Sequence, residues 1–361
     1  MDCPLVMDLG YGDFSGAFHK KASEQRIPVN GTIEVTMRCN LRCKHCYQPL
    51  SHRTAHTPNE LTLPEFQRIF SEITDAGCLW LLMTGGEPFL RPDFLDIYDD
   101  AKRKGLIITL FTNGTMLTPS IVDHLDEWRP FLVEISLYGA TAETYEAVTG
   151  IPGSYKRCMQ GIELLQEKKI PLKLKSVLLT INRHEIDDMQ RLSSQLGLEF
   201  FYDPVINGAI NGEKYPLQYR LSPEEIVAIE AKDERRAKAW PETYETWRDV
   251  KINTRKMYTC GGGRTGFHID AFGQMSLCLV AREPHYDLRA GSFKNCWEEF
   301  FTEVINREYE HDIECIHCRL RAVCAQCPGF AWTEAMNFEQ KSEFICKLAH
   351  LRSETFDKSD V

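Results

Sequence analysis

Residues 32–48 read "TIEVTMRCNLRCKHCYQ" and join a short β-rich run to a group of cysteines. Residues 32–37 alternate polar and apolar side chains, as a strand with two different faces requires. Cys39, Cys43 and Cys46 then fall within eight positions, and no fourth cysteine lies nearby. A structural zinc site takes four protein ligands, so this spacing leaves one coordination position to be filled by something else.

Further β-rich runs follow this stretch, with amphipathic segments between them. Two of these segments carry helix-start signals: Thr62 and Glu65 form a capping box, and Thr118 precedes Pro119 at the first helical position. Strands that alternate with helices predict a parallel sheet. We expect the strands at residues 32–37, 79–84, 106–111, 131–138, 171–180 and 198–203.

The two faces of these strands differ in polarity. A flat, doubly wound sheet is covered by helices on both faces and would need both to be apolar. The pattern therefore favours an α/β fold with a curved sheet, a partial barrel that encloses a cavity and pairs its acids with its lysines. A sheet exposed along its edge is the alternative. The apolar face carries Ile33, Val35, Ile135, Leu137, Leu172, Leu174 and Leu178, and the polar face carries Glu34, Thr36, Glu134, Ser136, Tyr138, Lys173 and Lys175.

Charge and hydropathy exclude several classes of partner. The formal charge of the 361 residues is −10, and the basic residues include only scattered pairs such as Lys20 with Lys21, which disfavours nucleic acid. No apolar stretch is long enough to cross a membrane, and the N-terminus lacks the features of a signal peptide. We expect a cytoplasmic protein with no membrane partner.

Fourteen cysteines in a reducing compartment are expected to bind metals or clusters instead of forming disulfides. Cys3, Cys78, Cys158 and Cys296 stand alone and are expected to be plain thiols. The others form groups: Cys39, Cys43, Cys46, Cys260, Cys278, Cys315, Cys318, Cys324, Cys327 and Cys346.

The distribution of these features suggests a division of the chain. We expect an N-terminal extension at 1–29, a barrel at 30–203, a connector at 204–257, a cysteine-rich domain at 258–350 and a tail at 351–361. Within the connector, Ser222, Pro223 and Glu225 open a polar helix that should run towards residue 240. A short helix and a loose polar end should follow Cys346.

The cysteine spacing, with the aromatic His45 before the last cysteine, resembles the hallmark of the radical S-adenosylmethionine (radical SAM) superfamily. The resemblance implies that Cys39, Cys43 and Cys46 are catalytic and hold three irons of a [4Fe-4S] cluster. The amino and carboxylate groups of S-adenosylmethionine would chelate the fourth iron, which supplies the missing ligand. His45 and Tyr47 would then border the cofactor.

Further matches lie where strands end, the side on which parallel barrels carry their chemistry. "TGGEPFLRPDF" at 84–94 resembles the GGEP element, which holds the methionine ammonium. The family resemblance spans residues 30–203 and implies a (β/α)6 TIM-like partial barrel. The further cofactor-binding residues that it implies are Gly85, Gly86, Glu87, Pro88, Asn113 of "TNG", Ser136 of "SLYG" for the ribose, and Arg183 of "TINRH" for the cofactor carboxylate.

The C-terminal cysteines resemble a SPASM domain, which binds two auxiliary [4Fe-4S] clusters, for three clusters in all. The resemblance assigns Cys260, Cys278 and Cys327 to one cluster, and Cys315, Cys318, Cys324 and Cys346 to the other. Two residues separate Cys324 from Cys327 where the pattern has three. The first auxiliary cluster lacks one ligand, for which water, a substrate atom, Cys296 and His268 are alternatives. A zinc ribbon is the alternative for the whole pattern.

The resemblance implies reductive cleavage of S-adenosylmethionine to a 5′-deoxyadenosyl radical that abstracts hydrogen from a substrate. SPASM-bearing peptide maturases suggest a ribosomally made peptide as substrate, modified by a thioether, a carbon–carbon crosslink or an epimerisation. The implied partners are a precursor peptide, an electron donor such as flavodoxin or ferredoxin, and a separate leader-binding protein. Small-molecule oxidation or decarboxylation, as of a tetrapyrrole side chain, and a zinc-stabilised binding module without catalysis are the alternatives.

Overall fold

A nine-stranded sheet is the centre of the computed structural model, which describes residues 11–49, 59–247, 250, 252 and 255–357. The strand order is β6-β5-β4-β3-β2-β1-β7-β8-β9, parallel from β6 to β7 and antiparallel from there to β9. The strands are β1 (Asn30–Glu34), β2 (Trp80–Thr84), β3 (Ile107–Thr112), β4 (Leu132–Ser136), β5 (Leu172–Val177), β6 (Glu199–Asp203), β7 (Gly266–Ile269), β8 (Gln274–Ser276) and β9 (Tyr286–Asp287). All six predicted strands are present, and the α/β partial barrel is confirmed.

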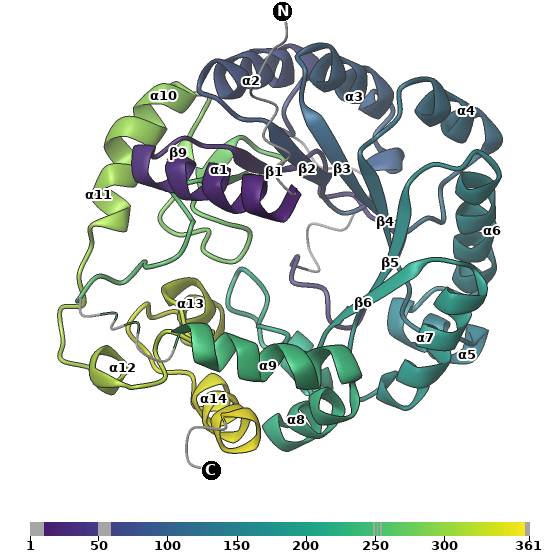
Figure 1. Ribbon diagram of the computed structural model, residues 1–361. Coiled ribbons are helices and arrows are strands. Elements are labelled where there is room, and N and C mark those ends of the chain that lie inside the picture. The colour runs from purple at the N-terminus through teal and green to yellow at the C-terminus, as the bar shows by residue number, and fades with distance from the viewer. Residues whose placement is uncertain (1–10, 50–58, 248–249, 251, 253–254, 358–361) are drawn as a thin grey trace, which may run out of the picture.

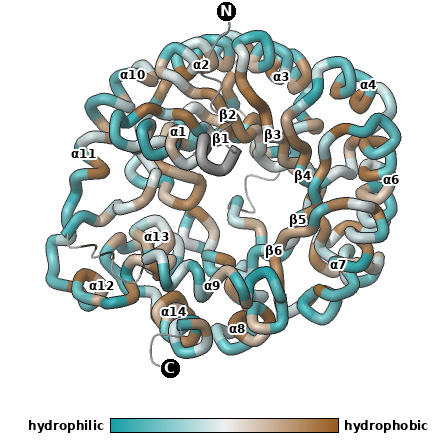
Figure 2. The backbone as a smooth tube through the Cα atoms, in the orientation of Figure 1, coloured by the Kyte–Doolittle hydropathy of each residue, from teal (hydrophilic) through white to brown (hydrophobic). Residues whose placement is uncertain are grey.

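The helices that follow the barrel strands surround the sheet on its outside, while α8, α9 and α14 lie together beyond β6 (Figure 1). Figure 2 shows hydrophobic residues along the strands and hydrophilic residues over the outer turns of the helices. The helices are α1 (Tyr11–Gln25), α2 (Leu63–Asp75), α3 (Phe94–Arg103), α4 (Pro119–Glu127), α5 (Ala142–Thr149), α6 (Ser154–Glu167), α7 (Ile186–Gln195), α8 (Pro223–Lys232), α9 (Glu234–Trp247), α10 (Phe293–Asn295), α11 (Phe301–Ile305), α12 (Glu314–His317), α13 (Pro328–Ala335) and α14 (Glu343–Phe356).

The predicted helix starts are confirmed at α2 and α4. The amide of Thr62 donates to Glu65 Oε2 at 2.7 Å, and Thr118 Oγ1 accepts from Ile121 N. Each bond satisfies a backbone or capping group that a helix end would otherwise leave unpaired. The buried residues of α2 recur at intervals of three and four, which turns one face of the helix to the sheet. They are Phe66, Ile69, Phe70 and Ile73.

The two faces of the barrel strands behave as their polarity predicts. The apolar face is buried against the helices. On the polar face, Lys175 Nζ lies 3.7 Å from Glu134 Oε2, and Lys173 pairs with the exposed Glu199 at 2.6 Å. Glu34 has no lysine partner among the described residues and instead pairs with Arg282 from the C-terminal region. The acids and lysines of the polar face therefore pair with one another only in part.

The described part of the connector contains two α-helices, α8 and α9, where the sequence predicts one. Asp233, between α8 and α9, is extended, and its Oδ1 accepts from the amides of Arg235 and Arg236. An aspartate in this position ends the first helix and caps the second. The helix expected after Cys346 is longer than predicted, since α14 begins at Glu343 and runs through the expected boundary at residue 350. Cys3 and the last residues of the tail lie outside the described residues.

The cysteine-rich region shares its sheet with the barrel. Strand β7 pairs with β1 in parallel, from Asn30 opposite Gly266 to Ile33 opposite Ile269. The proposed boundary at residue 258 therefore marks a change in composition, while the hydrogen-bonded sheet continues across it. Among the described residues, no helix is both long and apolar enough to cross a membrane.

Candidate active site

A cavity of about 480 Å³ lies at the carboxyl ends of the barrel strands. This is the end at which parallel α/β barrels carry their chemistry. Residues 37–48, here called the cysteine loop, form one wall, and the ends of β2 to β6 form a second. The predicted site residues that line the cavity are Cys39, Cys43, His45, Cys46, Tyr47, Gly85, Gly86, Asn113 and Ser136.

Segments distant in sequence hold the cysteine loop in place. The amides of Arg42 and Lys44 donate to carbonyl oxygens at the end of α5, at 2.8 and 3.0 Å. The hydroxyl of Tyr215 lies 2.6 Å from the carbonyl oxygen of Cys46 and 2.7 Å from that of Gln48. Tyr215 belongs to the connector, and no sequence signal marks it as part of the site.

The three thiols of the loop line the cavity together with Tyr138. Burial raises the pKa of Tyr138 well above its usual value, and the charges of Cys43, Cys46 and Cys39 raise it further. Within the described ranges, no three Cys, His, Asp or Glu side chains converge on one point, as a single zinc ion would require. The irons of a cluster occupy separate corners and take one thiolate each, so this donor set fits a cluster with one open iron.

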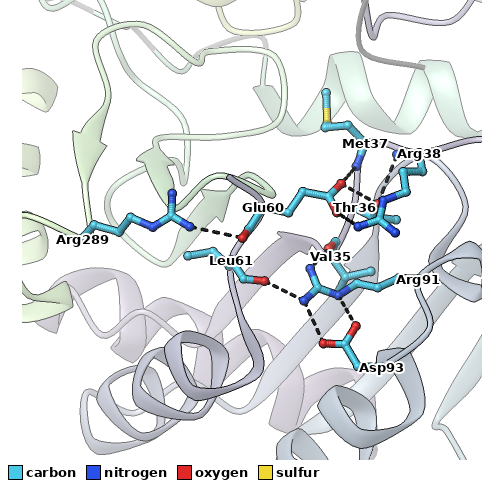
Figure 3. A network of polar contacts seen from close by, with 9 residues as sticks. All are labelled: Val35, Thr36, Met37, Arg38, Glu60, Leu61, Arg91, Asp93 and Arg289. Carbon is cyan, nitrogen blue, oxygen red and sulfur yellow. Dashed lines mark hydrogen bonds and ion pairs between the residues drawn. The ribbon is translucent and has the colours of Figure 1, made fainter. Parts of the chain in front are cut away.

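A buried polar network holds the residues before the first cysteine (Figure 3). Glu60 accepts from Thr36 Oγ1 at 2.6 Å, from the amide of Met37 at 2.9 Å and from Arg38 Nη2 at 2.6 Å. Arg91 donates to the carbonyl oxygens of Val35 and Leu61, at 2.9 and 2.6 Å. Because buried polar groups must be paired, these contacts fix the backbone that leads into the cysteine loop.

The glycines of the GGEP element are required by the protein's own backbone. A Cβ atom at Gly85 would lie 2.3 Å from the carbonyl oxygen of Thr36, and one at Gly86 would lie 2.1 Å from that of Arg38. The amide of Gly86 also donates to Thr36 O at 2.8 Å. The sequence suggests that these glycines let a ligand approach, whereas the closest approach here is to the chain that enters the cysteine loop.

Glu87 lies behind the cavity wall. Its carboxylate accepts from Thr112 Oγ1 and from the amide of Asn113, both at 2.8 Å, and from the amide of Phe89 at 3.3 Å. Burial raises the pKa of Glu87 to about 7. Pro88 follows it in a short 3-10 turn, and neither residue lines the cavity. Glu87 therefore organises the end of β3, and its contact with the methionine ammonium stays a prediction.

Asn113 joins the end of β3 to the cysteine loop, because its Nδ2 donates to Asn40 Oδ1 at 2.9 Å. The ring of His45 meets that of Tyr138 edge to face, with centroids 4.8 Å apart. Ser136 lines the cavity from the end of β4. These side chains surround the space beside the three thiols.

Arg183 is not brought to the cavity. It is ion-paired with Glu225 at the start of α8, and 43% of its side chain is exposed. Its predicted contact with the cofactor carboxylate is therefore not supported. Lys175 is the one lysine or arginine among the described lining residues. Burial lowers the pKa of Lys175 to about 7, against the opposing charge of Glu134.

One group of C-terminal cysteines surrounds a small cavity in the cysteine-rich region. Cys315, Cys318, Cys324 and Cys346 all line it. Burial raises the pKa of Cys324 to about 11, and the charges of the other three add to the effect. The structure brings together the four thiols that the sequence assigns to one cluster.

The second group consists of Cys260, Cys278 and Cys327. Burial raises the pKa of Cys327 to about 11, and the charges of Cys278 and Cys260 raise it further. Burial alone raises the pKa of Cys296, with no contribution from the charges of these thiols. His268 Nδ1 is hydrogen-bonded to Ser276 Oγ at 3.0 Å. The fourth ligand of this group stays a prediction.

The C-terminal region also closes the cavity, which the sequence alone does not predict. Leu279 and Val280, directly after Cys278, line it. The apolar run "LCLVA" around Cys278 was the available signal, but nothing in it indicates which wall it would cover.

The sequence profile of the radical SAM superfamily matches residues 33–193. This part of the chain is a radical SAM domain. Radical SAM enzymes use S-adenosylmethionine and a [4Fe-4S] cluster, and the three thiols beside an open cavity fit both. A zinc module without catalysis is thereby set aside.

Proteins similar to this chain carry different names. An AdoMet-dependent heme synthase of Methanosarcina barkeri is 29% identical over 86% of this chain and 94% of that protein. A PqqA peptide cyclase of Ruegeria pomeroyi is 34% identical, over 47% of this chain and 45% of that protein. The structure of Streptococcus suis SuiB bound to precursor peptide SuiA matches 96% of this chain and 83% of that one, with a TM-score of 0.67 and 16% identity. The last comparison shows a shared fold.

Proposed function

We propose that this radical SAM enzyme modifies a ribosomally made peptide, forming a thioether, a carbon–carbon crosslink or an epimer. The observation that carries the proposal is the charge of the cavity. Its described lining is largely apolar, with Glu134 and Asp203 as carboxylates and Lys175 as the one lysine or arginine. Such a lining suits a neutral or basic peptide side chain. A substrate with several carboxylates would meet like charges and too few cations.

Two comparisons support a peptide. SuiB binds a precursor peptide on the same fold, and the peptide cyclase of R. pomeroyi is similar over nearly half of this chain. We propose a precursor peptide as the substrate, with a flavodoxin or ferredoxin as electron donor and a separate protein for leader binding.

Each part of the site has a proposed role. Cys39, Cys43 and Cys46 would hold the cluster, and Gly85 to Pro88, Asn113 and Ser136 would orient S-adenosylmethionine beside it. When bound, this pair supplies a 5′-deoxyadenosyl radical. His45 and Tyr138 would exclude water from one side of the cavity, and Leu279 with Val280 from another.

We further propose two auxiliary [4Fe-4S] clusters, at Cys260, Cys278 and Cys327 and at Cys315, Cys318, Cys324 and Cys346. The clustering of the thiols into these two groups supports the assignment. Anaerobically reconstituted protein should then contain about 12 irons per chain. About four irons with two zincs would contradict the auxiliary clusters and spare the barrel site.

Oxidation or decarboxylation of a tetrapyrrole side chain is the second candidate. The match to the heme synthase of M. barkeri along 94% of that protein favours it. One lysine in the cavity lining offers a single partner for the propionate groups of such a substrate.

A parallel assay separates the two candidates. The reduced, reconstituted enzyme is incubated with S-adenosylmethionine and with either a peptide encoded beside its gene or an iron tetrapyrrole that bears propionate groups. We expect 5′-deoxyadenosine together with a modified peptide. A thioether or a carbon–carbon crosslink changes the peptide mass, and an epimer is detected by uptake of deuterium when the reaction is run in heavy water. Loss of carboxyl groups from the tetrapyrrole, with the peptide unchanged, would overturn the proposal. The variant with Cys39, Cys43 and Cys46 all replaced by Ala is the control and should form no 5′-deoxyadenosine.

A further inference from the structure

An ion pair with a fully buried carboxylate joins the barrel to the cysteine-rich region. Glu34, at the end of β1, is 0% exposed, and Arg282 donates to both of its oxygens at 2.8 Å. The hydroxyl of Tyr47 donates to Glu34 Oε1 at 2.9 Å. His268 Nε2 lies 3.6 Å from Glu34 Oε2. A bidentate pair of this kind is directional as well as strong, so it fixes the segments that carry its members.

Each member of this pair is connected to a cysteine site, Glu34 through the hydroxyl of Tyr47 and Arg282 through its own turn. Tyr47 directly follows Cys46, the last cysteine of the cysteine loop. Arg282 ends the turn that begins at Cys278, and its Nε donates to Leu279 O at 3.0 Å. Within the same turn, the amide of Ala281 donates to Cys278 Sγ at 3.3 Å. One five-residue turn thus carries a cysteine of the second site, forms part of the cavity wall and is pinned to β1.

We infer that Glu34 and Arg282 are positioning residues that link the two cysteine sites. They fix the turn of Cys278 against the loop of Cys46, and their charge balance sets the reduction potentials at both sites. The inference rests on the proposed cluster at Cys278 and on the radical SAM cluster at the cysteine loop. Neither residue need touch the substrate for this role.

The sign of the electrostatic effect follows from the charges. Arginine stays protonated in proteins, so removing the carboxylate of Glu34 leaves a buried positive charge. Reduction adds an electron to a cluster, and a nearby positive charge favours that step. Removing both charges restores neutrality. A change that acted only by disturbing the packing would not be reversed by a second substitution in the same place.

The test measures reduction potentials by electron paramagnetic resonance on the full chain with its clusters reconstituted. Glu34→Gln should raise the potential of the cysteine-loop cluster and of the Cys278 cluster. The double variant Glu34→Gln/Arg282→Gln should return both towards the wild-type values. Arg68→Gln is the matched control: Arg68 also joins the barrel to the C-terminal region, through Leu288 O at 2.7 Å, but lies on the surface. It should shift neither potential.

Unchanged potentials in Glu34→Gln, or a double variant as far from wild type as the single one, would overturn the inference. A buried charge without its partner is destabilising, so a second route uses conservative changes. Arg282→Lys should alter the spectrum of the reduced cysteine-loop cluster in the wild-type background and not in the Tyr47→Phe background. Equal effects in both backgrounds would also overturn it.

A separate experiment can refute the proposed auxiliary cluster without refuting the inference about the ion pair. Iron analysis of the Cys278→Ala variant decides whether Cys278 binds a cluster, whatever Glu34→Gln does. If no cluster is bound there, the potential of the cysteine-loop cluster alone still reports whether the ion pair acts on that site.

Discussion

At the scale of single residues, Lys175 shows how the barrel tunes a side chain. Its strand places it on the cavity wall beside Glu134, with 23% of the side chain exposed. The cost of burying an ammonium group exceeds the gain from a carboxylate 3.7 Å away, and the pKa falls from 10.5 to about 7. The lysine is therefore close to losing its proton at neutral pH.

This shift predicts a pH-dependent stability. Between pH 7 and 10.5 the unfolded chain holds a proton at Lys175 that the folded chain has lost, so Lys175 contributes a rise of the free energy of unfolding with pH. Buried thiols such as Cys324 and Cys327 act in the opposite direction, so the contribution of Lys175 is the difference in slope between the wild type and Lys175→Met. This difference should approach about 1.4 kcal/mol per pH unit. Lys175→Met should lack this contribution and exceed the wild type in stability most at pH 7 and below. Urea unfolding across this range measures it. Lys173→Met, on the same strand, keeps Lys175 and should keep the slope; loss of the slope there would contradict the assignment.

Substitution of Gly86 tests whether the GGEP glycines are needed for the close approach of the chain that enters the cysteine loop. Because a Cβ atom would lie 2.1 Å from Arg38 O, Gly86→Ala should cost about 3 kcal/mol and displace the entry to the cysteine loop. Thermal unfolding and iron retention measure both effects. Gly16→Ala in α1, where no atom lies within 4 Å, should gain up to about 1 kcal/mol. Equal stability of the two variants would argue against the backbone explanation.

At the scale of elements, the connector supports the site from outside the barrel. The short 3-10 helix η4 (Tyr215–Tyr219) places the Tyr215 hydroxyl on two carbonyl oxygens of the cysteine loop. These bonds hold the loop at its last cysteine. Nothing in "NGEKYPLQYR" predicts this, because the turn residues indicate a loop without indicating what it covers.

Tyr215→Phe should therefore loosen the cysteine loop without creating a cavity, because the ring is retained. Losing this hydrogen bond should cost about 1 kcal/mol and speed the loss of iron from the cysteine-loop cluster to a chelator. Release of iron over time, followed by absorbance, measures the effect. Tyr219→Phe, in the same short helix, is the control and should release iron at the wild-type rate. Matching rates in both variants would show that the tyrosine does not support the loop.

Local sequence patterns predict the strands of the barrel, but they do not predict the contacts between the barrel and the C-terminal region. Alternation in "FLVEISLY" and "PLKLKSVLLT" predicts β4 and β5, although each observed strand is shorter. Cysteine spacing predicts which thiols gather. By contrast, β7 is only "GFHI" and carries no period of its own, and its place beside β1 depends on long-range pairing. Arg183 pairs with Glu225 away from the cavity, because position after a strand does not fix the direction of a long side chain.

At the scale of the whole molecule, the C-terminal region is held by more than its cysteines. Strand β7 extends the barrel sheet, and Arg352 of α14 donates to both oxygens of the buried Glu230 in α8, at 2.8 Å. Cys346 lies in α14 as well. The helix that carries this cysteine is thus anchored to the connector independently of any cluster.

This anchoring sharpens a prediction for Cys318→Ala. If four thiolates close one auxiliary cluster, that cluster has no open iron and serves as an electron relay. The variant should stay soluble, because β7 and α14 keep their contacts, and it should still cleave S-adenosylmethionine at the intact cysteine loop. Product formation should fall much further than cleavage, so that 5′-deoxyadenosine accumulates without modified substrate. Both products are measured in parallel on monomeric protein. Equal loss of both, or loss of neither, would contradict the relay, and aggregation would show that the cluster holds the region together as a structural metal does.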